Sequence, residues 1–167
     1  MTEPTAGSSI IVADNDALIR DLLRSMLVNE GYSVFLAADG EEALGFAQRI
    51  RAQLVVLDLN MPRLNGFRAC EAIRGLPGYD RVPIVVLTVY DGWDAREAAR
   101  RIGATEFVTK PFRADALLRK LLALMGRSEA SLRRRMAQEW RRREPVPADA
   151  EAAELSHGLR VLSIYRR

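Results

Sequence analysis

Short apolar runs alternate with longer amphipathic stretches from residue 10 to about residue 125, and this alternation limits the fold more than any other feature. The apolar runs have the length and composition of strands, and one of them, 54–57, is wholly apolar, as in strands that are buried on both faces. The predicted strands are 10–13, 32–38, 54–57, 83–88 and 106–109.

The stretches between the runs have helical periodicity. The predicted helices are 16–31, 41–51, 65–74, 93–102 and 113–125. Asp16 is the expected N-cap of the first helix, and Gly31 is its expected end. The apolar face of that helix is predicted to contain Leu18, Leu22, Leu23, Met26 and Leu27. Because parallel neighbours need helical crossovers, the alternation predicts an α/β fold with a doubly wound, five-stranded parallel sheet.

Polar residues gather where the predicted strands end. Asp14, Asn15 and Asp16 follow the first strand, Asp58 follows the third, Thr88 ends the fourth and Lys110 follows the fifth. In such sheets the ligand site lies beyond the carboxyl ends of the strands. Neighbouring carboxylates repel each other, and Mg²⁺ relieves that repulsion through oxygen ligands. A metal ion, a hydroxyl and an ammonium together suit a phosphoryl group.

Four motifs in this order carry a family resemblance: "ADND", "LDLNMPRLNGF", "VLT" and "FVTKPF". Together, over residues 10–125, they resemble the receiver domain of two-component response regulators, the CheY-like fold. The resemblance implies strand order 2-1-3-4-5 and a signalling protein rather than a dedicated enzyme.

The resemblance also implies roles for single residues. Asp58 is similar to the phosphoacceptor, which takes a phosphoryl group from a sensor histidine kinase or a phosphotransfer protein. Thr88 and Lys110 resemble the pair that contacts the phosphoryl oxygens, and Phe107 resembles an aromatic switch. The Lys110–Pro111 peptide bond is expected to be cis.

The metal site implied by the resemblance contains Mg²⁺ held by Asp14, Asn15, Asp58 and the backbone carbonyl of Asn60. Asn60 and Tyr90 stand at positions that tune the lifetime of the phosphate. The family usually has an acid where this chain has Asn15. An amide oxygen coordinates Mg²⁺ without adding negative charge, so we expect weaker metal binding.

Two alternatives stay open. Because Asn15 replaces a metal-binding acid, a second interpretation is that the chain is a pseudo-receiver, that is, a docking module that no longer accepts phosphate. The stretch "IIVADNDALI" also resembles the first motif of haloacid-dehalogenase-type phosphohydrolases, with Asp14 as nucleophile and Asp16 as acid/base. The phosphohydrolase interpretation does not explain "DLNMPRLNG". It also requires a further acidic motif beyond Lys110, and this sequence has a single helix there instead.

The charge distribution changes after Gly126. Residues 1–126 carry 15 Lys and Arg against 16 Asp and Glu, whereas residues 127–167 carry 10 Arg against 6 acids. We expect a flexible N-terminus over 1–9, a receiver domain over 10–126, and a basic, mostly helical extension over 127–167. The extension's apolar stripe, its predicted interface, consists of Leu132, Met136 and Trp140.

The partner predictions follow from these features. Self-association is expected through the extension or through the face of the fourth helix, fifth strand and fifth helix. The extension is too short for a familiar DNA-binding domain, so nucleic acid is not an expected partner. One Cys and one His exclude an internal disulfide framework and a multi-His metal site. No apolar run has the length of a membrane span, and we expect a cytoplasmic protein.

Overall fold

The structure is a computed structural model that describes residues 9–89 and 93–126. The strands are β1 (Ser9–Ala13), β2 (Ser33–Ala37), β3 (Leu54–Asp58), β4 (Ile84–Thr88) and β5 (Glu106–Thr109). The helices are α1 (Ala17–Asn29), α2 (Gly40–Arg49), α3 (Gly66–Arg74), α4 (Trp93–Arg101) and α5 (Ala114–Leu124). All five strands are parallel, in the order β2-β1-β3-β4-β5. The predicted fold class and strand order are confirmed.

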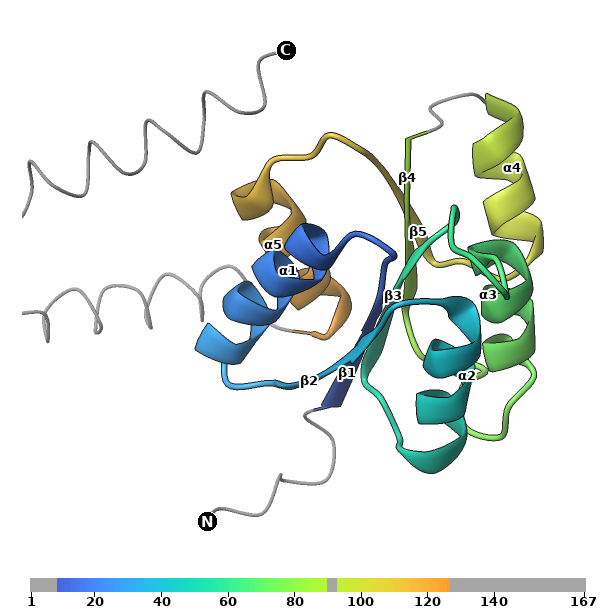
Figure 1. Ribbon diagram of the computed structural model, residues 1–167, viewed down its shortest axis with the longest axis horizontal. Coiled ribbons are helices and arrows are strands. Elements are labelled where there is room, and N and C mark those ends of the chain that lie inside the picture. The colour runs from blue at the N-terminus through green and yellow to red at the C-terminus, as the bar shows by residue number, and fades with distance from the viewer. Residues whose placement is uncertain (1–8, 90–92, 127–167) are drawn as a thin grey trace, which may run out of the picture. The chain divides into compact units, whose positions relative to one another are not determined.

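The helices form a layer on each side of the sheet. Helices α1 and α5 cover one face, and α2, α3 and α4 cover the other (Figure 1). Every residue of β3 and β4 is buried, because these central strands are covered on both faces. Alternate residues of the strands, such as Ile11, Val55 and Leu57, pack in one cluster with residues of α2 and α3. This packing fixes the carboxyl ends of the central strands.

Helix α1 begins as predicted, but its buried face is narrower. The Asp16 side chain accepts a hydrogen bond from the Leu18 backbone N–H at 2.9 Å, which confirms the N-cap. Leu23 and Leu27 are buried, whereas Leu18 and Leu22 are 68% and 40% exposed, so only part of the predicted apolar face is buried. The physical reason is helical geometry, since Leu18 and Leu22 lie one position away from the stripe that includes Leu23 and Leu27.

The ends of the described region differ slightly from the prediction. Ser9 belongs to β1 rather than to a flexible N-terminus, because it pairs with Ser33 and its carbonyl accepts a hydrogen bond from the Gln53 N–H at 2.8 Å. Tyr90 and the predicted extension, including Leu132, Met136 and Trp140, lie outside the described residues. Within 9–89 and 93–126, no helix is long and apolar enough to cross a membrane.

Candidate functional site

Three of the predicted site residues stand at the carboxyl ends of the three central strands. Asp14 directly follows β1, while Asp58 and Thr88 are the last residues of β3 and β4. Asp14 and Thr88 are fully buried, and Asp58 is only 4% exposed. Because β1, β3 and β4 are adjacent and parallel, their carboxyl ends lie along the same edge of the sheet (Figure 1). The sheet therefore brings two carboxylates and a hydroxyl to one place.

Lys110 follows β5 and joins the two carboxylates. Its ammonium Nζ lies 2.6 Å from Asp14 Oδ2 and 3.2 Å from Asp58 Oδ2. The Lys110 backbone N–H donates a hydrogen bond to the Thr88 carbonyl at 2.6 Å, and the Lys110–Pro111 bond is cis, as predicted. Asp14, Asp58 and Lys110 thus meet in space, with Thr88 linked to them through the backbone.

The balance of charge at this edge is negative, because one ammonium faces two buried carboxylates. Burial raises the pKa of Asp14 above its ordinary value of 3.8. The hydrogen bonds from Lys110 and from the Asp16 N–H oppose that rise, and the neighbouring Asp58 adds to it. A further positive charge at this place would favour the ionised form of Asp14.

Backbone and side-chain contacts orient the acidic segment after β1. The Asp16 N–H donates to Asp14 Oδ1 at 2.9 Å, and Arg20 Nη1 donates to the Asp14 carbonyl at 2.6 Å. The Asp16 carboxylate is engaged in capping α1. The Asn15 side chain is exposed at the edge of the site. Sequence reasoning missed Arg20, which lies one helical turn beyond the cap.

Asn60 follows Asp58 in the loop between β3 and α3. Its backbone N–H donates to Asp58 Oδ1 at 3.2 Å, so each carboxylate oxygen of Asp58 has a partner. Gly66 closes the loop against the strand, since a β-carbon there would lie 2.0 Å from the Asp58 carbonyl oxygen. Only glycine permits this close approach.

Phe107 lies on β5, three residues before Lys110. It is half-buried, and the Arg96 guanidinium of α4 stands 5.3 Å from the centre of its ring, within cation–π range. Sequence reasoning did not find Arg96. The helical periodicity gave no sign that a charged residue of α4 would cover an aromatic residue of β5.

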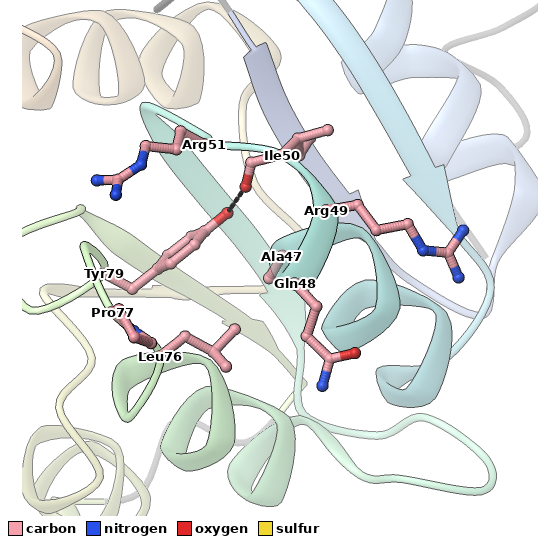
Figure 2. A pocket seen from close by; sticks show the side chains of 8 residues that line it. All are labelled: Ala47, Gln48, Arg49, Ile50, Arg51, Leu76, Pro77 and Tyr79. Atoms are coloured by element: carbon pink, nitrogen blue, oxygen red, sulfur yellow. Dashed lines mark hydrogen bonds between the residues drawn. The ribbon is translucent and has the colours of Figure 1, made fainter.

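A pocket of about 340 Å³ lies at the opposite end of the sheet. It is lined by the last turn of α2, by the loop that follows it, and by Leu76, Pro77 and Tyr79 (Figure 2). There the Tyr79 hydroxyl donates to the Ile50 carbonyl at 2.8 Å and accepts a hydrogen bond from the Ala52 N–H at 3.2 Å. None of the predicted site residues lines this pocket, and the tyrosine hydroxyl serves to join two loops.

The described residues contain no cluster of three or more His, Cys, Asp or Glu side chains that could hold a metal ion. The set implied by the resemblance has two carboxylates, Asp14 and Asp58, and completes its ligands with an amide and a backbone carbonyl. One ammonium contacts an oxygen of each carboxylate, so both carboxylates face the same positive group. The donor set is of the oxygen type that Mg²⁺ prefers.

Comparison with known proteins shows the family. The profile of the response regulator receiver domain matches residues 10–122. The chain is 37% identical over 158 residues to response regulator MprA of Mycobacterium tuberculosis, covering 94% of this chain and 66% of that protein. It is 42% identical over 119 residues to MprA of Mycolicibacterium vanbaalenii, covering 71% of this chain and 51% of that one. The chain thus spans between about half and two thirds of these relatives.

Solved structures agree. Chemotaxis protein CheY4 of Vibrio cholerae matches with a TM-score of 0.67 and 34% identity, over 71% of this chain and 99% of that one. The receiver domain of sensor histidine kinase PA1611 from Pseudomonas aeruginosa, which has a magnesium ion coordinated in its active-site cleft, matches with a TM-score of 0.66 and 32% identity, over 73% and 100%. The chain belongs to the receiver domain family of two-component response regulators, which decides against the phosphohydrolase alternative.

The site geometry predicts a pH-dependent loss of stability in Lys110→Met. Removing the ammonium leaves Asp14 and Asp58 without their ion pair, so the free energy of unfolding at about pH 7 should fall by about 1–3 kcal/mol. Without the ammonium, the pKa of Asp14 should rise further above its ordinary value. A folded protein that contains a carboxyl group with a raised pKa becomes less stable as the pH rises through that pKa. The loss should therefore be smaller at about pH 4. Urea unfolding in EDTA measures both values.

The matched control is Lys120→Met, which removes an ammonium from a half-exposed pair with Glu106. Such pairs contribute little. Equal losses in the two variants, or a Lys110→Met loss that does not change with pH, would contradict the assignment of Lys110 to a buried cluster.

Proposed function

We propose that Asp58 accepts a phosphoryl group from a sensor histidine kinase or a phosphotransfer protein, in a reaction that needs Mg²⁺. The observation that carries this proposal is the meeting of Asp14, Asp58 and Lys110 at the carboxyl edge of the sheet. A nucleophilic carboxylate beside a second carboxylate and an ammonium suits phosphoryl transfer, which depends on positioning and on neutralising the phosphoryl oxygens.

In this proposal Asp58 is the nucleophile. One of its oxygens forms the new bond to phosphorus while the bond from phosphorus to the donor nitrogen breaks, and the imidazole of the partner leaves. The Asn60 N–H holds Oδ1 of Asp58, and Oδ2 faces Lys110. Lys110 then turns from the carboxylate to the incoming phosphoryl oxygens, and Thr88 donates its hydroxyl to them.

Asp14, Asp58, Asn15 and the Asn60 carbonyl are the proposed metal ligands. When bound, Mg²⁺ would supply positive charge to the phosphoryl oxygens. Asp14 is held for this role by the Asp16 N–H, and its burial excludes water from one side of the site. Asn60 and Tyr90 are proposed to tune how long the phosphate persists.

The proposed output is a change in association with a partner or a second copy of the chain. Thr88 and Lys110 connect the site to β5, because the Lys110 N–H donates to the Thr88 carbonyl and Thr88 pairs with Thr109. Movement of Thr88 toward a phosphoryl group would pass to Phe107 and to Arg96 above its ring. The face of α4, β5 and α5 is therefore the proposed switching surface, and the extension over 127–167 is a second candidate for self-association.

A second candidate function rests on Asn15. The amide removes one negative charge from the proposed metal site, and a chain that binds Mg²⁺ too weakly would serve as a phosphorylation-independent docking module. Measurements of phosphate gain and of Mg²⁺ affinity, described next, distinguish the two functions.

We expect a small-molecule phosphodonor to add one phosphate to the full chain when Mg²⁺ is present. Asp58→Asn should abolish the mass gain, because the amide is not a nucleophile for this reaction. The exposed Asp80→Asn is the matched control and should leave it unchanged. Intact mass spectrometry with and without EDTA makes the measurement. A gain that survives Asp58→Asn would refute the phosphoacceptor assignment, and no gain in the wild type would favour the docking module.

Asn15→Asp should strengthen Mg²⁺ binding by about tenfold, or about 1.4 kcal/mol, because it adds a charged oxygen ligand to the site. Gln53→Glu adds the same charge at an exposed position before β3 and should leave the affinity unchanged. Isothermal titration of each full-length variant measures the dissociation constant. Equal affinities for Asn15→Asp and the wild type would place residue 15 outside the metal site.

A further inference from the structure

The loop between β3 and α3, residues 59–65, is fastened to the N-terminus of α2. The Gly40 N–H donates to the Leu64 carbonyl at 3.1 Å, and a β-carbon at Gly40 would lie 2.2 Å from that oxygen. The two backbones therefore touch, and glycine at position 40 is required for the contact.

An ionic cluster strengthens this attachment. The Arg63 guanidinium pairs through Nη2 with Asp39 Oδ2, and it lies 3.8 Å from Glu42 Oε1 and 3.9 Å from Glu41 Oε2. Asp39 is fully buried, and its Oδ1 caps α2 by accepting a hydrogen bond from the Glu42 N–H at 2.9 Å. Apart from Arg63, its Oδ2 has no hydrogen-bond partner among the described residues. Loss of Arg63 would leave a buried carboxylate oxygen unpaired.

The backbone of Arg63 has an uncommon conformation at this attachment. Arg63 has φ 60°, in the left-handed region that residues other than glycine rarely adopt. An exposed ion pair would not hold such a conformation, because it contributes little. The Arg63 side chain is 56% exposed, but its partner Asp39 is fully buried and part of a helix cap, so the geometry of the pair is fixed from the Asp39 side.

The loop carries Asn60, three residues before Arg63. Between them Met61 is buried in the core cluster, and before them the Asn60 N–H contacts Asp58 Oδ1. Asn60 is thus held between the strand and the anchors at Met61 and Arg63. The direction of its backbone depends on both ends of this short segment.

We propose that Arg63 is a positioning residue that sets the affinity of the site for a divalent cation. In this proposal the Arg63–Asp39 pair holds the loop in the conformation in which the Asn60 carbonyl serves as a ligand together with Asp14 and Asp58. This inference rests on the proposed metal-dependent function. Among the described residues, neither Arg63 nor Asp39 forms an ion pair with Asp58 or Lys110, so we infer that Arg63 acts through the loop.

The test compares four full-length variants. Arg63→Gln removes the charge and keeps the β-carbon, Arg63→Lys keeps a charge, and Arg63→Gly removes the charge but suits the left-handed backbone. Arg68→Gln removes an exposed arginine from the first turn of α3 and is the matched control. Two quantities are measured: the Mg²⁺ dissociation constant by calorimetry, and amide hydrogen exchange of Asn60 and Gly66 without metal.

Arg63→Gln should raise the Mg²⁺ dissociation constant about tenfold, the usual effect of losing a residue that orients a ligand. It should also speed exchange at Asn60 and Gly66. Arg63→Lys should recover most of both properties, Arg63→Gly should resemble Arg63→Gln in affinity, and Arg68→Gln should match the wild type.

The outcome that overturns the inference is an Arg63→Gln protein whose Mg²⁺ affinity and loop exchange equal those of the wild type, whatever its stability. Failure of the proposed function looks different. If the wild-type chain gains no phosphate but binds Mg²⁺, the proposed function fails, and the role of Arg63 is still tested by Mg²⁺ affinity and by amide exchange. If the wild-type chain binds no Mg²⁺, amide exchange at Asn60 and Gly66 alone tests the role of Arg63.

Discussion

The site depends on the contact of one ammonium with two buried carboxylates. Asp14 and Asp58 end neighbouring strands, so the sheet places them together although their charges repel. Lys110 compensates one of the two charges, at 2.6 and 3.2 Å, and leaves a net negative charge that burial makes costly. A net negative site of this kind suits the cation and the phosphoryl group that we propose for it. Its chemistry thus follows from where the parallel strands end.

The same edge of the sheet is held from several directions. The backbone of Lys110 joins β5 to Thr88, the Asp16 N–H holds Asp14, and the loop after Asp58 is closed by Gly66 and fastened to α2 by Arg63. These supports are all contacts between residues of the chain itself, within the part that the structure describes. Preorganisation of this kind lowers the cost of binding and reaction. The fold therefore contributes to function mainly by fixing the loops at the ends of its strands.

Much of this structure could be predicted from the sequence, because periodicity identifies helices and strands, and strand ends identify the edge that carries the site. The N-cap role of Asp16 could also be predicted from the sequence. The exposure of Leu18 and Leu22 in α1 could not be predicted, since both residues are apolar and lie close to the buried stripe. The contacts of Arg63 with Asp39 and of Arg96 with Phe107 join segments distant in sequence, and no local pattern reports such pairs.

The central claim is that Asp14, Asp58 and the Asn60 backbone form one cation site. The most direct measurement is the amide NMR spectrum of the full chain titrated with Mn²⁺, whose unpaired electrons broaden nearby signals. We expect the signals of Asp14, Asp58 and Asn60 to broaden first, at low Mn²⁺, and added Mg²⁺ to restore them. Broadening that begins instead near Glu41 and Glu42, or that Mg²⁺ does not reverse, would contradict it.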